Sequence, residues 1–564
     1  MTNFKRRPLA ALLAALGCTA AIAQTPPDAG TVLREIEQRP RVPLVPIGPP
    51  PTISIQGEST KNLAPEAAAA TLKLNGVRVT DSTVFPAEEL EGLVDASLHG
   101  VVSLADVEQA AERITQHYRE RGYILARAYV PPQDIADGRI RIAVVEGRYG
   151  AIQVANQSRV REATLERYVD RAHLGEVVNE DALNRALLVL REVVHGAPVT
   201  ATLRPGAETG TSDLIVLVAG EPFVQARVEA DNYGGRSTGR YRVGGAVQLN
   251  ELFGFGDQLE VRVLTSTQGQ DYLRLGWSTP LGSSGLRMEA SFARSLYSLG
   301  GDFAALDASG NADVTGVTFS YPVVRGLGWN VTAQGGAEYK SLEDRVGALG
   351  TVARKSTSVL SLGANAERFG DEGDATSGSL RLESGRLNLK DAVSQATDAA
   401  GLGTRGSFSK LAFAALHSMP LADRWTFQAS ISGQSAGKNL DSSEKFSLGG
   451  PFGVRAYPVG EATGDSGWVS SAELRYLLAG LSGGVGVTLF GFLDYGSAKL
   501  NEDPLPTAAV NRRDLSAAGV GVSLVRPGDY AVRAMYAQRL GSELATSDRR
   551  GGRGQLWLQA TKSF

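Results

Sequence analysis

Apolar and polar residues alternate along the C-terminal part of the chain, from about residue 222 onward. In residues 224–231, valine and alanine alternate with glutamine, arginine, glutamate and aspartate, and residues 258–263, 272–277 and 286–292 repeat the pattern. Because successive side chains of a strand point to opposite faces, each segment has one apolar face and one polar face. The segments continue to residue 564 and are separated by loops rich in glycine, aspartate and serine. This pattern is typical of a transmembrane β-barrel with a lipid-facing exterior and a wet interior.

The length of this region predicts the number of strands. At about 21 residues for a strand and its connection, residues 222–564 hold about 16 antiparallel strands, and the even counts 14 and 18 are the alternatives. Leu556, Leu558, Ala560 and Phe564 share one face of the last segment. A last strand that ends in an aromatic residue is typical of outer-membrane barrels. We therefore expect Phe564 to be the C-terminal signal for the barrel-assembly machinery.

The first 23 residues are predicted to be a secretory signal peptide rather than part of the fold. They contain a positive start, an apolar run and a small-x-small site: Lys5-Arg6-Arg7, residues 9–16 and Ala21-Ile22-Ala23. We expect cleavage between Ala23 and Gln24. A lipoprotein signal around Cys18 is the alternative, but Ala15 stands where a larger aliphatic residue is usual. The mature chain would have no cysteine, and therefore neither a disulfide nor a thiolate metal site.

Residues 24–52 are predicted to form a short amphipathic helix followed by a stiff spacer. Val32, Leu33 and Ile36 recur at one-turn spacing and give the helix one apolar stripe. Six prolines follow between residues 40 and 51, and such a tract is extended and cannot join a core. A lone helix on a spacer buries too little surface to be stable. We therefore expect the helix to dock on the same protein, and a frayed tail is the alternative.

Two α+β units of about 75 residues precede the barrel, at residues 70–148 and 149–221. Each has the order β-α-α-β-β and ends in a strand that stops at a glycine, Gly147 or Gly220. In the first unit, a helical pattern covers residues 103–121. Strand patterns cover residues 71–79, 124–130 and 139–145. The repetition indicates an internal duplication. Units of this kind leave a sheet edge free, and a free edge can accept an extended peptide as an additional strand.

The composition fits an exported β-protein. Lysine and arginine total 57 and aspartate and glutamate total 60, and the net charge of −3 argues against nucleic acid as the main partner. The 66 glycines suit a large β-structure with many turns. No stretch after the first 25 residues approaches the ~18 consecutive apolar residues of a membrane-spanning helix. With a signal peptide and a barrel, the expected location is the outer membrane of a Gram-negative cell.

No arrangement of residues predicts an enzyme, a cofactor site or a metal site. Gly464-Asp465-Ser466-Gly467 resembles the nucleophile segment of trypsin-like proteases, but the five histidines are scattered singly, so the serine has no base. We expect this segment to be an exposed turn. Residues 401–406 match a dinucleotide-binding fingerprint by letter. They do not follow a buried strand in a βαβ unit, so we expect a glycine-rich loop.

Two motifs in the barrel region carry candidate chemistry. Val454-Arg455-Ala456-Tyr457 lies in a glycine-rich connection that is long for a barrel. Later in the chain, Phe492, Asp494 and Gly496 share one face of a strand. If Leu493 and Tyr495 face lipid, Asp494 points into the lumen, where an inward-folding loop could pair Arg455 with it. A solvated loop arginine and an ordinary lumen carboxylate are the alternative.

The order of these elements resembles the outer-membrane transporters of two-partner secretion. This is the TpsB family of ShlB/FhaC/HecB-like haemolysin secretion/activation proteins, which are related to BamA. Val454-Arg455-Ala456-Tyr457 resembles the family's Val-Arg-Gly-Tyr at the tip of the sixth extracellular loop, and Phe492-x-Asp494-x-Gly496 resembles the strand motif that receives its arginine. Further family-like runs are Tyr118-x-x-Arg121-Gly122-Tyr123, Val145-Glu146-Gly147 and Asp231-Asn232-Tyr233-Gly234. Ala456 departs from the pattern, and since alanine tolerates positive φ poorly, we expect a slightly different tip conformation.

The resemblance implies that the two units are POTRA-like domains in the periplasm and that the helix of Val32, Leu33 and Ile36 plugs the barrel together with the inward loop. It also implies export of one large β-helical exoprotein of the haemolysin or adhesin type, a TpsA-type partner. The POTRA-like domains would catch the unfolded partner, and the lipid-embedded barrel would thread it to the surface without a nucleotide. An outer-membrane protein insertase of the BamA or TamA type is the alternative function, whereas a passive porin would need no such repeats.

Overall fold

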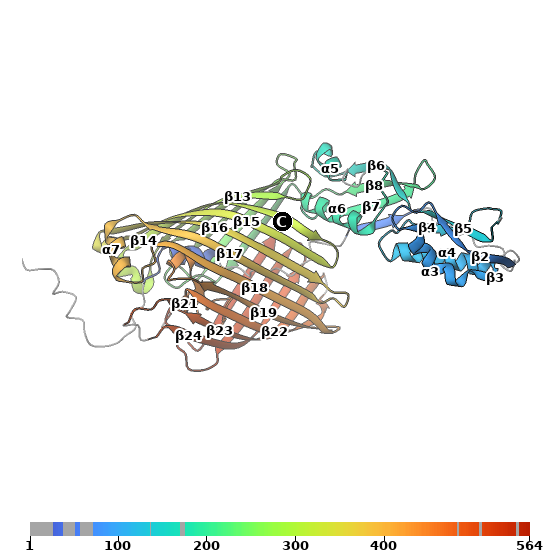
Figure 1. Ribbon diagram of the computed structural model, residues 1–564. Helices are drawn as coiled ribbons and strands as arrows, with labels where there is room; N and C mark the ends of the chain where they lie inside the picture. The colour runs from blue at the N-terminus through green and yellow to red at the C-terminus, as the bar shows by residue number, and fades with distance from the viewer. Residues whose placement is uncertain are drawn as a thin grey trace, which may run out of the picture.

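The computed structural model describes residues 26–37, 51–56, 71–135, 137–169, 175–481, 484–506, 510–548 and 552–564. A β-barrel forms one end of the molecule, and two α+β units extend from one of its rims (Figure 1). The signal peptide, with the predicted cleavage between Ala23 and Gln24, and residues 38–50 of the spacer lie outside the described residues. No helix in the described ranges is both long enough and apolar enough to span a membrane.

The described part of the chain closes into a barrel of 16 antiparallel strands, which confirms the predicted fold. Consecutive strands of the barrel are hydrogen-bonded neighbours, and β26 pairs with β9 to close it. The strands are β9 (Val224–Asp231), β10 (Arg242–Asn250), β11 (Gln258–Ser266), β12 (Gln270–Pro280), β13 (Arg287–Ser298), β14 (Ala308–Arg325), β15 (Trp329–Val346), β16 (Thr351–Phe369), β17 (Ala375–Leu389), β18 (Gly406–Ala422), β19 (Trp425–Ala436), β22 (Ser466–Leu481), β23 (Val485–Lys499), β24 (Arg512–Arg526), β25 (Tyr530–Arg539) and β26 (Gly554–Ser563).

Alternation sorts the side chains of these strands between the outer wall and the lumen. Leu360 of β16 is 66% exposed, as expected for a lipid-facing side chain. Glu229 of β9 and Arg262 of β11 instead form a 2.7 Å ion pair on the inner side of the wall. A closed sheet satisfies every backbone group along its strands, which allows it to cross a bilayer. The lumen therefore contains paired charged groups, whereas apolar side chains such as Leu360 cover the exterior.

The first α+β unit packs two helices against a four-stranded sheet of order β3-β2-β5-β4. Its elements are β2 (Thr71–Thr80), α3 (Ala87–Val94), β3 (His99–Ser103), α4 (Leu104–Arg119), β4 (Arg127–Tyr129) and β5 (Arg139–Val145). Helix α4 begins where the sequence places it, because Ser103 and Asp106 form a reciprocal capping box. The sequence did not predict β3. Strand β4 is shorter than the predicted strand at 124–130, because Ala126 closes a turn with Tyr123.

The second α+β unit contains a strand that the sequence did not predict. Its own elements are β6 (Arg148–Asn156), α5 (Glu162–Val169), α6 (Glu180–Val193), β7 (Val199–Pro205) and β8 (Thr211–Val218). The additional strand β1 (Thr52–Ile55) follows the proline tract and pairs in parallel with β7, which gives the sheet order β1-β7-β8-β6. Ile53 packs against the core of the unit. The chain itself therefore occupies the β7 edge of this sheet, although units of this kind were expected to leave a sheet edge free.

A buried carboxylate holds the two α+β units together. Glu146, at the end of β5, accepts hydrogen bonds from the backbone N–H of Thr83 at 2.6 Å and from the Tyr118 hydroxyl at 3.0 Å. Burial raises the pKa of Glu146, but these hydrogen bonds, above all those from Thr83, outweigh burial and leave it below its usual range. Arg148 of β6 donates to the Thr83 hydroxyl at 2.5 Å. The family-like Val145-Glu146-Gly147 run thus forms the joint between the units.

The second unit is docked on the rim of the barrel, with α6 beside the turns between strands (Figure 1). Glu192 of α6 pairs with Arg325 of β14 at 2.7 Å. The Tyr168 hydroxyl donates to the carbonyl of Gly282 at 2.8 Å. These contacts join the unit to two different turns on one side of the barrel rim.

Candidate functional site

One long connection of the barrel folds inward rather than away from it. This inward loop, residues 437–465, links β19 to β22 and contains the short helix η5 (Ser442–Glu444) and the paired strands β20 (Phe446–Ser447) and β21 (Thr463–Gly464). Its loop tip consists of Val454, Arg455, Ala456 and Tyr457, and all four residues are buried. The alternative of a solvated loop arginine does not apply, because Arg455 is only 5% exposed.

Arg455 is held by Asp494 through three hydrogen bonds. Its Nε lies 2.9 Å from Asp494 Oδ2 and its Nη2 lies 2.7 Å from Oδ1, which is a bidentate pair. The backbone N–H of Arg455 also donates to Oδ2 at 3.0 Å. Leu493 and Tyr495 are exposed on the outer wall, so Asp494 points into the lumen as the alternation of β23 requires. The structure thus brings together the two charged residues singled out in the sequence.

Two further residues bind the same guanidinium, and the sequence analysis missed both. Arg455 Nη1 donates to Glu473 Oε2 at 2.8 Å, and Nη2 donates to the Ser471 hydroxyl at 2.8 Å. Both lie on β22, two residues apart, and Ser471 is the register partner of Asp494. The only signal in the sequence that could have found them is the alternation along β22, which places every second side chain in the lumen. Glu473 also pairs with Arg475 at 2.7 Å, so it is less dependent on Arg455 than Asp494 is.

The remaining residues of the strand motif shape the space for the loop tip. The ring of Phe492 lies under the guanidinium of Arg455, 3.3 Å from its Cζ to the ring centroid, as in a cation–π contact. At Gly496, a Cβ atom would lie 3.1 Å from Val454 Cγ2. Glycine therefore leaves room for the tip. Ala456 does not have positive φ; in this loop Ala462 does, with φ 49°. The expected difference in tip conformation thus has no basis in backbone strain at Ala456.

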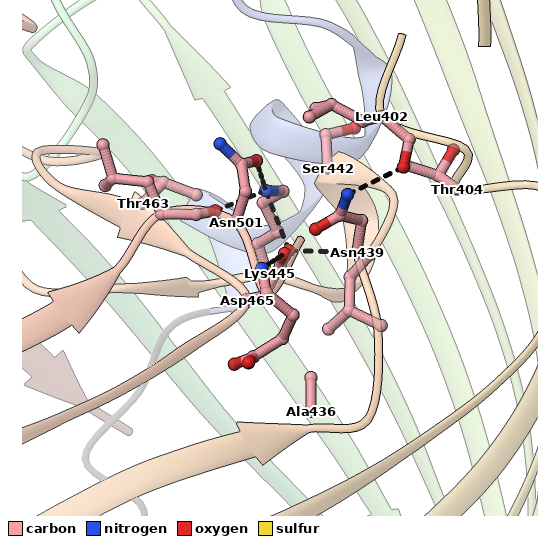
Figure 2. A network of polar contacts seen from close by, with 12 residues as sticks. Leu402, Thr404, Ala436, Asn439, Ser442, Lys445, Thr463, Asp465 and Asn501 are labelled. Carbon is pink, nitrogen blue, oxygen red and sulfur yellow. Dashed lines mark hydrogen bonds and ion pairs between the residues drawn. The ribbon is translucent and has the colours of Figure 1, made fainter. Parts of the chain in front are cut away.

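The part of the inward loop that contains Asn439, Lys445 and Asp465 is hydrogen-bonded to two neighbouring extracellular connections (Figure 2). Asp465 is fully buried and pairs with Lys445 at 2.8 Å, and Lys445 also donates to Asn501 at 3.2 Å. Asn439 donates to the carbonyl of Leu402 at 2.7 Å. The prediction that residues 464–467 form an exposed turn is therefore wrong. The aspartate of this segment is a structural anchor, because the loop folds over it.

The N-terminal helix α1 (Ala29–Glu37) lies inside the barrel. Val32, Leu33 and Ile36 are buried against inward-facing side chains of β11–β15, which include Leu264, Tyr272, Ala293, Tyr297, Ala312, Val314 and Leu342. At the start of the helix, Asp28 pairs with Lys355 at 2.7 Å. The helix therefore docks on the same protein, with its apolar stripe against one side of the wall.

Helix α1 also contacts the inward loop. Arg34 donates to the backbone carbonyl of Ser442 in η5, and Lys355 pairs with both Asp28 and Asp441, the latter at 2.8 Å. A Cβ atom at Gly30 would lie 2.7 Å from the backbone nitrogen of Ser443, so the helix approaches η5 closely. Helix and loop thus contact each other inside the barrel.

The chain terminus lies on the outer wall at the closing junction of the barrel. Phe564 and Ala226 exchange backbone hydrogen bonds of 2.9 and 3.3 Å, and the Phe564 side chain is 71% exposed. Its role as an assembly signal stays a prediction. Among the described residues, no group of three or more His, Cys, Asp or Glu side chains is placed to hold a metal ion.

Comparison with known proteins identifies the family. Residues 210–524 match the sequence model of the family described as haemolysin secretion/activation protein ShlB/FhaC/HecB, and residues 72–147 match that of the ShlB-type POTRA domain. The chain belongs to this family. It is thus a TpsB-type outer-membrane transporter for secreted exoproteins, with its POTRA domains in the periplasm. Members of the family are transporters rather than enzymes.

Individual relatives agree with this membership. The chain is 26% identical over 550 residues to the heme/hemopexin transporter protein HuxB of Haemophilus influenzae (strain 86-028NP), covering 95% of both chains. It is 26% identical over 416 residues to the outer membrane transporter CdiB of Dickeya dadantii (strain 3937), covering 72% of both. The solved structure of CdiB from Escherichia coli has a TM-score of 0.71 at 20% identity and covers 90% of this chain and 93% of that one. This structural similarity shows the TpsB fold.

Proposed function

We propose that this protein secretes one large β-helical exoprotein of the haemolysin or adhesin type. The POTRA domains take the unfolded partner from the periplasm, and the barrel passes it to the cell surface. The observation that carries the proposal is the occupied lumen: α1 and the loop tip both pack inside a closed barrel. A closed barrel whose lumen holds two parts of its own chain is suited to gated passage of a polypeptide. No nucleotide is needed, because folding of the partner outside opposes its return.

The β7 edge of the second POTRA domain is the proposed entry point for the partner. Strand addition to a sheet edge binds an extended peptide through its backbone. This edge now carries β1, which belongs to the segment between α1 and the first POTRA domain. A partner strand must displace β1 to bind there. Binding should therefore be weak, at micromolar or higher Kd, because displacement and ordering both cost free energy.

Locking β1 in place is expected to reduce secretion at least fivefold. Ser54 Oγ and Thr202 Oγ1 are 3.1 Å apart, so Ser54→Cys with Thr202→Cys places two thiols within reach of a disulfide. The mature chain would contain no other cysteine. Secretion should fall under oxidising conditions and recover after reduction, and each single cysteine variant serves as the control. If the oxidised double variant secretes at the wild-type level, β7 is not the entry point.

Co-expression tests the proposed function directly. The chain is expressed in a heterologous Gram-negative host together with a candidate large β-helical exoprotein from the same genome, and the exoprotein is measured in the medium. We expect secretion only when both are present. If the protein is instead an insertase of the BamA type, its expression should restore outer-membrane barrels to a host depleted of its own insertase and leave the exoprotein in the periplasm. That outcome would contradict the proposal.

A further inference from the structure

The seam, which we define as the junction of β9 and β26, is held by few backbone pairs. Five residues of β26 face five residues of β9, from Gln559 opposite Asp231 to Ser563 opposite Arg227, and Phe564 continues this pairing by its two backbone hydrogen bonds with Ala226. On its other side, β26 pairs nine residues with β25. Above this ladder the backbone N–H of Asn232 still donates to the Leu558 carbonyl at 3.2 Å, and residues 554–557 of β26 extend toward the cell surface without a residue of β9 opposite them in the described structure. The backbone groups of this segment that point away from β25 need another partner.

The side chain of Asn232 takes the place of the missing strand. Asn232 belongs to the family-like Asp231-Asn232-Tyr233-Gly234 run, to which the transport mechanism above assigns no role. Its Nδ2 donates to the carbonyl of Leu556 at 2.8 Å, and its Oδ1 accepts from the N–H of Leu558 at 2.8 Å. A side-chain amide offers the same donor and acceptor as a peptide group. Asn232 therefore holds the backbone of β26 on both sides of residue 557.

Residue 557 is a tryptophan that points inward and reaches the loop tip. Trp557 is 4% exposed, and its Nε1 donates to the backbone carbonyl of Arg455 at 2.7 Å. The ring of Tyr233 packs edge-on against both Trp557 and Phe452, with centroid distances of 5.7 Å. Arg455 is thus held twice: its guanidinium by the wall at β22 and β23, and its carbonyl by β26 next to the seam.

We propose that Asn232 and Trp557 are positioning residues that couple closure of the seam to seating of the loop tip. When the tip leaves, the buried indole N–H loses its partner, and the inward position of Trp557 becomes less favourable. The segment that Asn232 holds is then loosened at its centre. Because a coupling free energy is reciprocal, loosening the seam must also favour release of the tip.

This inference extends the proposed function, because it names how opening spreads from the lumen to the barrel wall. Its test measures conformation rather than secretion, so its failure leaves the proposed function standing. Spin labels at Ser237→Cys and Gln555→Cys measure the width of the seam by pulsed electron resonance on the full-length protein in membranes. The rate at which an impermeant maleimide labels Ala456→Cys from outside measures how often the tip leaves its seat.

The decisive measurements are those in which a substitution at the tip is read out at the seam and a substitution at the seam is read out at the tip. Asp494→Ala, a change at the tip, should increase the population of long distances across the seam about fivefold. Asn232→Ala, a change at the seam, removes two solvent-exposed hydrogen bonds to β26 and should speed labelling of Ala456→Cys about fivefold to tenfold, which corresponds to about 1 kcal/mol. Trp557→Phe, which retains a ring but removes the N–H, should do both. Trp277→Phe is the matched control, because the indole nitrogen of Trp277 is buried without a hydrogen-bond partner.

The coupling is overturned if Asp494→Ala leaves the seam distances at their wild-type distribution or if Asn232→Ala leaves the labelling rate unchanged. A Trp557→Phe variant that behaves like Trp277→Phe in both readings overturns it as well. If Asn232→Ala does not assemble, Asn232→Asp replaces it. Aspartate retains the acceptor for Leu558 and loses the donor for Leu556, so the same crossed reading applies.

Discussion

Replacing Arg455 by alanine is expected to reduce secretion of the partner at least tenfold while the barrel stays assembled in the outer membrane. The substitution removes the guanidinium that neutralises Asp494 and Glu473, and it leaves the buried Asp494 carboxylate without its charged partner. Breaking a buried ion pair costs about 3–5 kcal/mol, which is enough to unseat the tip in most molecules. The barrel strands keep their backbone ladders, so the loss should be in transport and not in folding.

A series of variants separates this effect from general damage. Asp494→Ala should be as severe as Arg455→Ala, because Asp494 accepts three hydrogen bonds from Arg455. Glu473→Ala should be milder, since it removes one of two carboxylates around the guanidinium and Asp494 remains. Ser471→Ala removes the hydrogen bond that the hydroxyl accepts from Arg455 and the one it donates to Asp494, and because both partners are charged it should cost about 1.5–3 kcal/mol. Secreted partner is measured per unit of heat-modifiable transporter. Wild-type secretion by both Arg455→Ala and Asp494→Ala would remove the pair from the mechanism.

Deleting residues 24–39 is expected to increase single-channel conductance in planar bilayers severalfold. The deletion removes α1 from the lumen, where its apolar stripe covers side chains of five strands, β11–β15. Water and ions then fill the space that the helix occupied. The inward loop remains seated, so the open pore should still be narrower than an empty 16-strand barrel.

The helix anchor offers a graded version of the same experiment. Lys355→Ala removes the cation that joins Asp28 to Asp441 but leaves the helix on the chain. It should increase the frequency of openings without changing the conductance of each opening. Leu360→Ala, on the outer wall, is the matched control and should leave both unchanged. If the deletion variant conducts like the wild type, α1 does not plug the pore.

The barrel and the central ion pair could be predicted because their signals are local or periodic. Alternation with period 2 predicted the barrel, and the length of residues 222–564 predicted about 16 strands, as the structure has. Arg455 and Asp494 stood out within recognisable motifs. The partners Glu473 and Ser471 carry no motif of their own. They became visible only once the register of β22 with β23 placed them opposite Asp494.

Other elements depend on tertiary contacts that no local pattern reports. Strand β1 is a four-residue segment after a proline tract, and only pairing with β7 makes it a strand. Asp465 lies in a segment with the composition of a turn, and its burial follows from loops folding over it. The sequence shows Trp557 only as one more inward-facing residue of the last strand. Its hydrogen bond to the Arg455 carbonyl depends on the position of the loop tip.

Passage of the partner through the lumen is the central claim, and crosslinking to a stalled partner tests it most directly. Gln334 shares the face of β15 with Lys340, which points inward to Glu444 of the loop, whereas Ala333 lies on the opposite face. A photoreactive side chain is placed at either position, and the partner carries a disulfide-closed domain that halts its export. We predict a crosslink to the partner from position 334 and none from position 333. Equal crosslinking from both positions, or from neither while the POTRA domains still crosslink, would contradict passage through the barrel.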